Sequence, residues 1–185
     1  MRLIWLIFGT LFGALLAAKW LTSRPVPAVS TLPTTAMFVA ERRSVLAPPP
    51  SARADSVVSF ALAQLGTPYV YAGTHPETGF DCSGFLHYVY GHFGIDTPHS
   101  TALLIGAGRP VPRSLARPGD LVVFTGTAAT STTPGHAGIV VSALGETPLR
   151  FVHASSARRE PGVKISAVEG TGYERRFMQV RRVLQ

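Results

Sequence analysis

The only cysteine of the chain, Cys82, is its strongest candidate nucleophile, and it stands in the run Asp81-Cys82-Ser83-Gly84. Apolar side chains recur at helical spacing over residues 82–92, and Gly94 follows as an end signal, so the pattern predicts a helix that begins at Cys82. The first turn of a helix presents unpaired N–H groups and the positive end of the helix dipole, which lower a thiol pKa and can hold an oxyanion. The small and polar neighbours disfavour the alternative, an inert cysteine in an apolar core.

A nucleophilic thiol needs a base, and two of the six histidines are suitably placed. His136 stands at the start of an apolar strand in Gly135-His136-Ala137-Gly138, and His153 ends the strand-like run Phe151-Val152-His153. Adjacent antiparallel strands bring both rings to one end of a sheet, where one ring acts as base and the other orients it. The alternative for each is a histidine satisfied by a backbone carbonyl. The other four are interpreted as structural or exposed: His75, His87, His92 and His99.

Metal and cofactor chemistry find little support in the sequence. A single cysteine excludes the usual cysteine-rich zinc sites, and no third ligand at metal-site spacing accompanies the two histidines. We therefore expect no metal and no cofactor.

The expected elements form an α+β domain with N-terminal helices packed on an antiparallel β-sheet. A helix from about Asp55 to a stop at Gly66 is followed by a loop over 67–80, the helix at 82–92, and a short helix within 98–106. Strands are expected afterwards, at Leu121–Phe124, Ala137–Ser142, Arg150–His153, Val163–Val168 and Phe177–Val183. Helices first and strands afterwards are typical of an α+β fold.

The N-terminal region is expected to direct export. Residues 1–22 combine the basic start Met1-Arg2 with an uncharged apolar stretch from Leu3 to Ala18, which predicts either a cleaved signal peptide or a retained membrane anchor. Residues 23–52 are rich in proline and small polar residues and predict a semi-rigid linker. Residues 53–185 are then one folded domain.

The balance of 17 basic and 10 acidic residues gives a net charge of +7 and favours a polyanionic neighbour. Nucleic acid is not expected, because the chain has no zinc-finger spacing, no RNA-binding aromatic motif and no run of five or more basic residues. Bacterial envelope polymers and anionic lipid remain as polyanionic neighbours.

The sequence contains five motif blocks: Gly66–Gly73, Phe80–Phe85, Arg117–Val122, Gly135–Val140 and Phe151–Ser156. In order and spacing these blocks resemble the NlpC-type cysteine peptidases, which are papain-like hydrolases of bacterial peptidoglycan. The resemblance covers about Asp55 to Val183. It implies Cys82 as nucleophile, His136 as base, His153 as the orienting third residue, and Tyr69 as an oxyanion stabiliser beside the N–H of Cys82. It also implies that Asp81 and Ser83 contact the stem peptide; a helix cap is the alternative for Asp81, and loop packing for Tyr69.

The implied activity is hydrolysis of amide bonds in peptidoglycan stem peptides or cross-links, often the bond between D-glutamate and a diamino acid, through an acyl-enzyme. We expect a monomer on the periplasmic or extracellular side of the cell envelope. Two alternatives stay open. One is a catalytically silent cell-wall-binding or scaffold module on the same fold. The other is an acyltransferase of the related permuted group, in which the histidine precedes the cysteine, unlike the order here.

The sequence departs from the family pattern at two places. Ala72-Gly73 stands where two glycines are common, which is tolerated if position 72 needs no positive φ. The segment Thr125–Pro134 is longer than usual before His136, and we expect it to form part of the cleft wall and to affect substrate preference.

Overall fold

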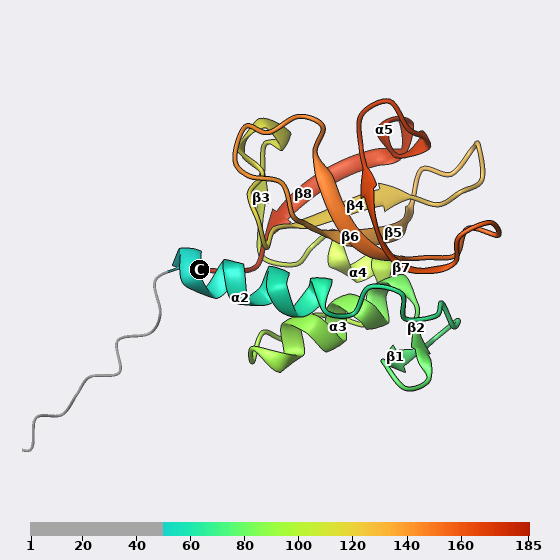
Figure 1. The fold of residues 1–185 in the computed structure, drawn as a ribbon. Helices are drawn as coiled ribbons and strands as arrows, with labels where there is room; N and C mark the ends of the chain where they lie inside the picture. The colour runs from blue at the N-terminus through green and yellow to red at the C-terminus, as the bar shows by residue number, and fades with distance from the viewer. Residues whose placement is uncertain (1–49) are drawn as a thin grey trace, which may run out of the picture. The chain divides into compact units, whose positions relative to one another are not determined.

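The computed structural model describes residues 50–185, beginning with helix α2 (Pro50–Leu62; Figure 1). The expected export segment and the expected linker up to residue 49 lie outside the described residues. The helix expected from about Asp55 begins earlier, at Pro50. Proline is compatible with the first turn of a helix, since the N–H that it lacks would have no partner there. None of the helices within residues 50–185 is both long and apolar enough to cross a membrane.

The segment before the candidate nucleophile is a compact loop that contains two very short strands. β1 (Thr74–His75) and β2 (Gly79–Phe80) pair antiparallel. Helix α3 (Cys82–His92) then has the predicted bounds, and Gly94 follows with a φ of 68°. Helix α4 (Thr101–Leu104) is shorter than the segment 98–106 in which it was expected.

Six strands form one antiparallel sheet in the order β3-β8-β4-β5-β6-β7. All five predicted strands are present within a few residues of their expected bounds. The structure adds the edge strand β3, the 3-10 helix η1 (Arg113–Leu115) and the short helix α5 (Gly172–Arg176). The strands are β3 (Arg109–Val111), β4 (Leu121–Thr125), β5 (Pro134–Val140), β6 (Arg150–Ser155), β7 (Gly162–Ala167) and β8 (Phe177–Arg182).

The sheet buries apolar side chains on both faces. Figure 1 shows α2, α3 and α4 together on one side of the sheet and α5 on the other. Successive residues of a strand point to opposite faces. In β4, Leu121 and Val123 accordingly join the core beneath the helices, while Val122 and Phe124 join a second core beside α5. The predicted α+β architecture is confirmed.

The block Arg117–Val122 has a structural role, because it forms the turn that leads into β4 and supplies a buried carboxylate there. Asp120 is 1% exposed and accepts hydrogen bonds from the Arg117 N–H at 3.0 Å and from Nε and Nη2 of Arg182, each at 2.7 Å. Arg182 ends β8, so this buried ion pair fastens the start of β4 to the neighbouring strand.

Ala72 corrects one expectation. Its φ is 59°, in the left-handed region, so the assumption that this position needs no positive φ is wrong. The turn that leads into β1 requires this conformation, which glycine adopts freely and which costs an L-residue roughly 1–2 kcal/mol. The chain carries that strain in the loop beside Cys82.

Candidate active site

The start of α3 is held by a network centred on the Asp81 carboxylate. Asp81 is the N-cap, and its Oδ1 accepts from the Gly84 N–H at 2.7 Å and from the Ser83 hydroxyl at 3.1 Å. His99 Nε2 lies 3.1 Å from both Asp81 oxygens. A Cβ on Gly84 would lie 2.1 Å from the carbonyl oxygen of Gly73, so only glycine lets the loop pack directly on this first turn.

Cys82 is the first residue of α3 and is partly exposed. Burial, followed by the negative charge of Asp81, raises the pKa of its thiol to about 11. The backbone N–H groups of Ser83, Ala137 and Cys82 itself act in the opposite direction. The N–H groups at the helix start therefore lower the pKa as expected, but desolvation and Asp81 outweigh them, and the net shift is upward.

The two predicted histidines meet at one end of the sheet, on the paired strands β5 and β6. His136 Nε2 lies 2.8 Å from His153 Nδ1, and the rings are perpendicular with centroids 4.8 Å apart. Gly138 lets β6 approach β5 closely beside this pair, because a Cβ there would lie 2.5 Å from Cδ2 of Phe151 and 2.8 Å from the carbonyl oxygen of Val152. The expectation that antiparallel strands bring both rings together is confirmed.

Both rings are held neutral. Burial, then the charge of Arg176, lowers the pKa of His136 to about 3. Burial, followed by the charges of His136, Lys164 and Arg176, lowers that of His153 to about 2. His153 Nε2 lies 2.9 Å from the Ser166 hydroxyl, so the contacts run in series from His136 through His153 to Ser166.

The helix and the sheet meet through the residue after His136. The N–H of Ala137 is one of the three groups that lower the Cys82 pKa, so β5 reaches the first turn of α3. Tyr69 forms a parallel bridge with Phe80, which stands two residues before Cys82. Burial, followed by the charges of Cys82 and Asp81, raises the Tyr69 pKa.

Four neighbours of the site were not predicted from the sequence. His99 was interpreted as structural or exposed, yet it contacts the Asp81 carboxylate. Ser166 adjoins His153, and the Tyr173 ring stacks on His136 with centroids 5.7 Å apart. Arg176 lies over the Tyr173 ring. Tyr173 and Arg176 both lie on α5. This helix has only five residues, which are too few for its helical period to be recognised in the sequence.

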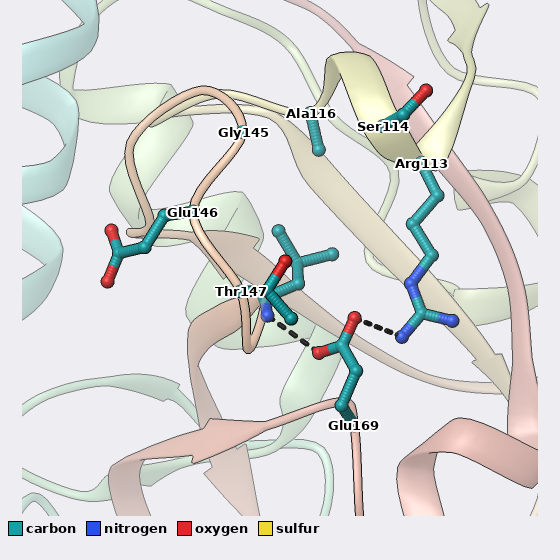
Figure 2. Close-up of a pocket in the computed structure, with 8 residues that line it drawn as sticks. Arg113, Ser114, Ala116, Gly145, Glu146, Thr147 and Glu169 are labelled. Carbon is teal, nitrogen blue, oxygen red and sulfur yellow. Dashed lines mark hydrogen bonds and ion pairs between the residues drawn. The ribbon is translucent and has the colours of Figure 1, made fainter.

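A pocket of about 410 Å³ lies away from these residues, at the opposite end of β5 from His136 (Figure 2). Figure 2 shows Arg113 paired with Glu169, whose carboxylate also accepts from the Leu149 N–H at 2.6 Å. The central charges of this pocket satisfy one another, and no predicted site residue lines it. Within residues 50–185, no group of three or more histidine, cysteine or acidic side chains could hold a metal ion.

The protein is thus of the α+β class, with a cysteine at the start of a helix and a histidine pair on an antiparallel sheet. The chain belongs to the NlpC/P60 family, whose sequence profile matches residues 66–182. It is 32% identical over 157 residues to the probable endopeptidase NlpC of Escherichia coli, covering 80% of this chain and 95% of that protein.

A probable endopeptidase of Mycobacterium tuberculosis is 41% identical over 86 residues, which are 46% of this chain and 20% of that protein. The chain thus spans about a fifth of the length of this relative. The crystal structure of an NlpC/P60 family protein from Bacillus cereus superposes with a TM-score of 0.62 at 29% identity, covering 71% of this chain and 40% of the other.

Proposed function

We propose that this protein is a cysteine endopeptidase that hydrolyses amide bonds in the stem peptides of peptidoglycan, in the cell envelope. Cys82 is the nucleophile, His136 the base and His153 the residue that orients the base. The bond between D-glutamate and a diamino acid is the first candidate, as the resemblance to the family implies. A silent cell-wall-binding module is the alternative that the test must separate from this proposal.

The observation that carries the proposal is the approach of β5 to the first turn of α3. His136 and Ala137 are consecutive, and the Ala137 N–H acts on the Cys82 thiol. The ring nitrogen of His136 that has no partner within residues 50–185 is Nδ1, because Nε2 faces His153. A base that accepts a proton at Nδ1 carries its own proton at Nε2 and donates it to His153 Nδ1. His153 then donates from Nε2 to the Ser166 hydroxyl, which fixes both tautomers.

The resting state is a neutral thiol beside a neutral imidazole, since the pKa of Cys82 is raised and that of His136 is lowered. The proton therefore moves to His136 as the sulfur attacks the amide carbon. The N–H of Cys82 and the Tyr69 hydroxyl hold the oxyanion that forms. His136 then gives its proton to the departing amine, and water releases the acyl group from Cys82.

Asp81 and Ser83 are proposed to contact the stem peptide. Both are largely buried, and Ser83 donates to Asp81, which also caps α3. A substrate amide therefore meets a carboxylate that is already fixed in position, which favours orientation of the peptide over the nucleophile.

The test uses the full chain and its Cys82→Ala variant, incubated with purified peptidoglycan. Soluble fragments are identified by mass spectrometry. New peptide fragments from the wild type alone support the endopeptidase and name the bond. Absence of fragments from a folded wild type that still binds peptidoglycan supports the silent module.

A further inference from the structure

A second pocket, of about 260 Å³, lies between the β4–β5 loop and α5. The loop belongs to the segment Thr125–Pro134, which was expected from the sequence to form part of the cleft wall. The volume of the pocket suits one amino-acid residue. Pockets for larger ligands usually exceed about 300 Å³. The loop contributes Thr127, Ala128, Ala129 and Ser131 to the wall, and α5 contributes Arg175 and Arg176.

The pocket adjoins the site through Arg176 and Tyr173. The Arg176 guanidinium carbon lies 5.3 Å from the centre of the Tyr173 ring, which stacks on His136. The strand register gives the same placement, because Phe124 pairs with His136 immediately before the loop begins.

The charge of this pocket is positive and unbalanced. Arg176 donates from Nε and Nη2 to the Thr125 carbonyl oxygen, at 3.1 and 2.7 Å, which leaves Nη1 without a partner in the described part of the chain. Neither Arg175 nor Arg176 forms an ion pair there. Glu174 accepts from the Gly170 N–H at 3.0 Å instead. A partly desolvated guanidinium without a carboxylate partner favours an anion.

The walls are fixed without a ligand. The Gly126 N–H donates to the Thr133 carbonyl at 3.1 Å, and the Ser131 N–H to the Ala128 carbonyl at 2.9 Å. Thr171 caps α5 by accepting from the Tyr173 N–H at 3.1 Å. A preformed pocket loses little conformational entropy when it binds.

We propose that this pocket is a subsite for a carboxylate of the stem-peptide residue on the leaving-group side of the scissile bond. The inference rests on the proposed function. The base returns its proton to the departing amine, so the leaving group lies on the His136 side, where the pocket is. Guanidinium groups match the planar geometry of a carboxylate, and Arg176 and Arg175 are the two ligands.

The leaving fragment of a stem peptide carries two such carboxylates: the chain terminus and, where the diamino acid is diaminopimelate, the carboxylate of its side chain. Both have the same chemistry, and amidation of one at a time tells them apart. The α-carboxylate of D-glutamate lies on the acyl side and provides an internal control.

The experiment measures equilibrium binding of synthetic D-glutamyl-diaminopimelyl stem peptides to the full chain carrying Cys82→Ala, which keeps the peptides intact. Affinities are compared for the free peptide and for peptides amidated at the terminus, at the side-chain carboxylate, or at D-glutamate. The same series is run with Arg175→Gln and with Arg176→Gln added. Arg109→Gln serves as the matched control, because it removes an exposed charge at the far end of the sheet, beside the last residue of β8.

We expect amidation of one leaving-side carboxylate to weaken binding roughly tenfold, as charged hydrogen bonds typically contribute. The Arg175→Gln and Arg176→Gln variants should bring this ratio towards one, while Arg109→Gln keeps it. Arg175 is exposed and forms no hydrogen bond with another side chain of residues 50–185, so its variant tests the subsite even if Arg176→Gln loosens the loop.

Equal binding of all four peptides, no measurable binding, or discrimination that persists in both arginine variants overturns the subsite. Hydrolysis by the wild type is recorded separately. A wild-type chain that leaves the free peptide intact contradicts the proposed function, whereas the binding ratios of the Cys82→Ala protein still decide the subsite.

Discussion

Asp81 holds the start of α3 together and at the same time opposes ionisation of Cys82, and one substitution separates the two effects. Its carboxylate caps the helix by accepting from the Gly84 N–H, and its charge raises the Cys82 pKa. Asparagine keeps a side-chain oxygen and is as good an N-cap as aspartate, but it carries no charge. Asp81→Asn should therefore make the thiol more reactive and leave the fold nearly as stable.

The size of the effect follows from Coulomb's law. Two unit charges about 6 Å apart, at an effective dielectric constant of about 20 to 40, interact by about 1.4 to 2.8 kcal/mol, equivalent to about 1 to 2 pKa units. A thiolate of lower pKa is also a weaker nucleophile, with a Brønsted coefficient of about 0.4–0.5. The alkylation rate at pH 8 should thus rise about 3- to 12-fold in Asp81→Asn.

The assay is alkylation of the full chain by iodoacetamide, followed by mass spectrometry. Cys82 is the only cysteine, so every label reports on this thiol. In the wild type the rate should keep rising from pH 7 to pH 10, because the Cys82 pKa is about 11. Hydrolysis by Asp81→Asn should fall, since Asp81 is proposed to contact the substrate.

Two controls bracket this prediction. Asp81→Ala should show the same gain in reactivity together with a loss of about 1 kcal/mol in the free energy of unfolding, because the cap is gone. Asp96→Asn removes an exposed charge beyond the other end of α3 and should leave the rate unchanged. An alkylation rate in Asp81→Asn that equals or falls below the wild-type rate would refute the electrostatic argument, as would a plateau below pH 7 in the wild type.

Three further predictions concern stability and are measured by urea denaturation of the full chain. His136 and His153 have pKa values lowered to about 3 and about 2, so below pH 6.5 the unfolded chain binds more protons than the folded one. Their contribution is complete above about pH 6.5 and is lost as pH falls, by up to about 1.4 kcal/mol per pH unit for each ring. Between pH 6 and pH 5, His153→Gln should reduce that slope, and an unchanged slope contradicts the neutral pair. Ala72→Gly should raise the free energy of unfolding by about 0.5–1 kcal/mol, because it relieves the left-handed strain and only part of the gain is offset by a more flexible unfolded chain; a destabilised variant would contradict this. Asp120→Ala should cost about 3–5 kcal/mol, because it strands the largely buried Arg182, whereas Glu160→Ala, which breaks an exposed pair with Lys164, should stay within about 0.5 kcal/mol of wild type. Similar losses in the last two variants would show that burial does not set the value of these ion pairs.

The elements that the sequence predicted well are those with a long pattern or a strong boundary signal. Helix α3 has a cap residue, a repeating apolar face and a terminal glycine, and its predicted bounds match the structure. The five predicted strands are apolar runs bounded by turn residues. The strand β3 was missed because it has three residues, one of them proline, as is typical of an edge strand.

The electrostatics of the site could not be predicted from local sequence. A helix start lowers a thiol pKa, and that local effect is present at Cys82, but burial depends on elements distant in the chain. His99 shows the same limit, because nothing in residues 98–106 indicates that its ring reaches Asp81. Ala72 needed the backbone conformation of a turn whose type the sequence left open.

The neutral resting state also bears on the choice between an enzyme and a silent binding module. A thiol with a pKa of about 11 is poorly ionised at neutral pH, which taken alone favours the module. The histidine pair argues the other way. His136 and His153 are two neutral rings in contact, and they make the fold less stable as pH falls. A module that only binds needs neither ring. A base that must accept a proton from Cys82 and keep its imidazolium hydrogen-bonded needs both, so we favour the enzyme.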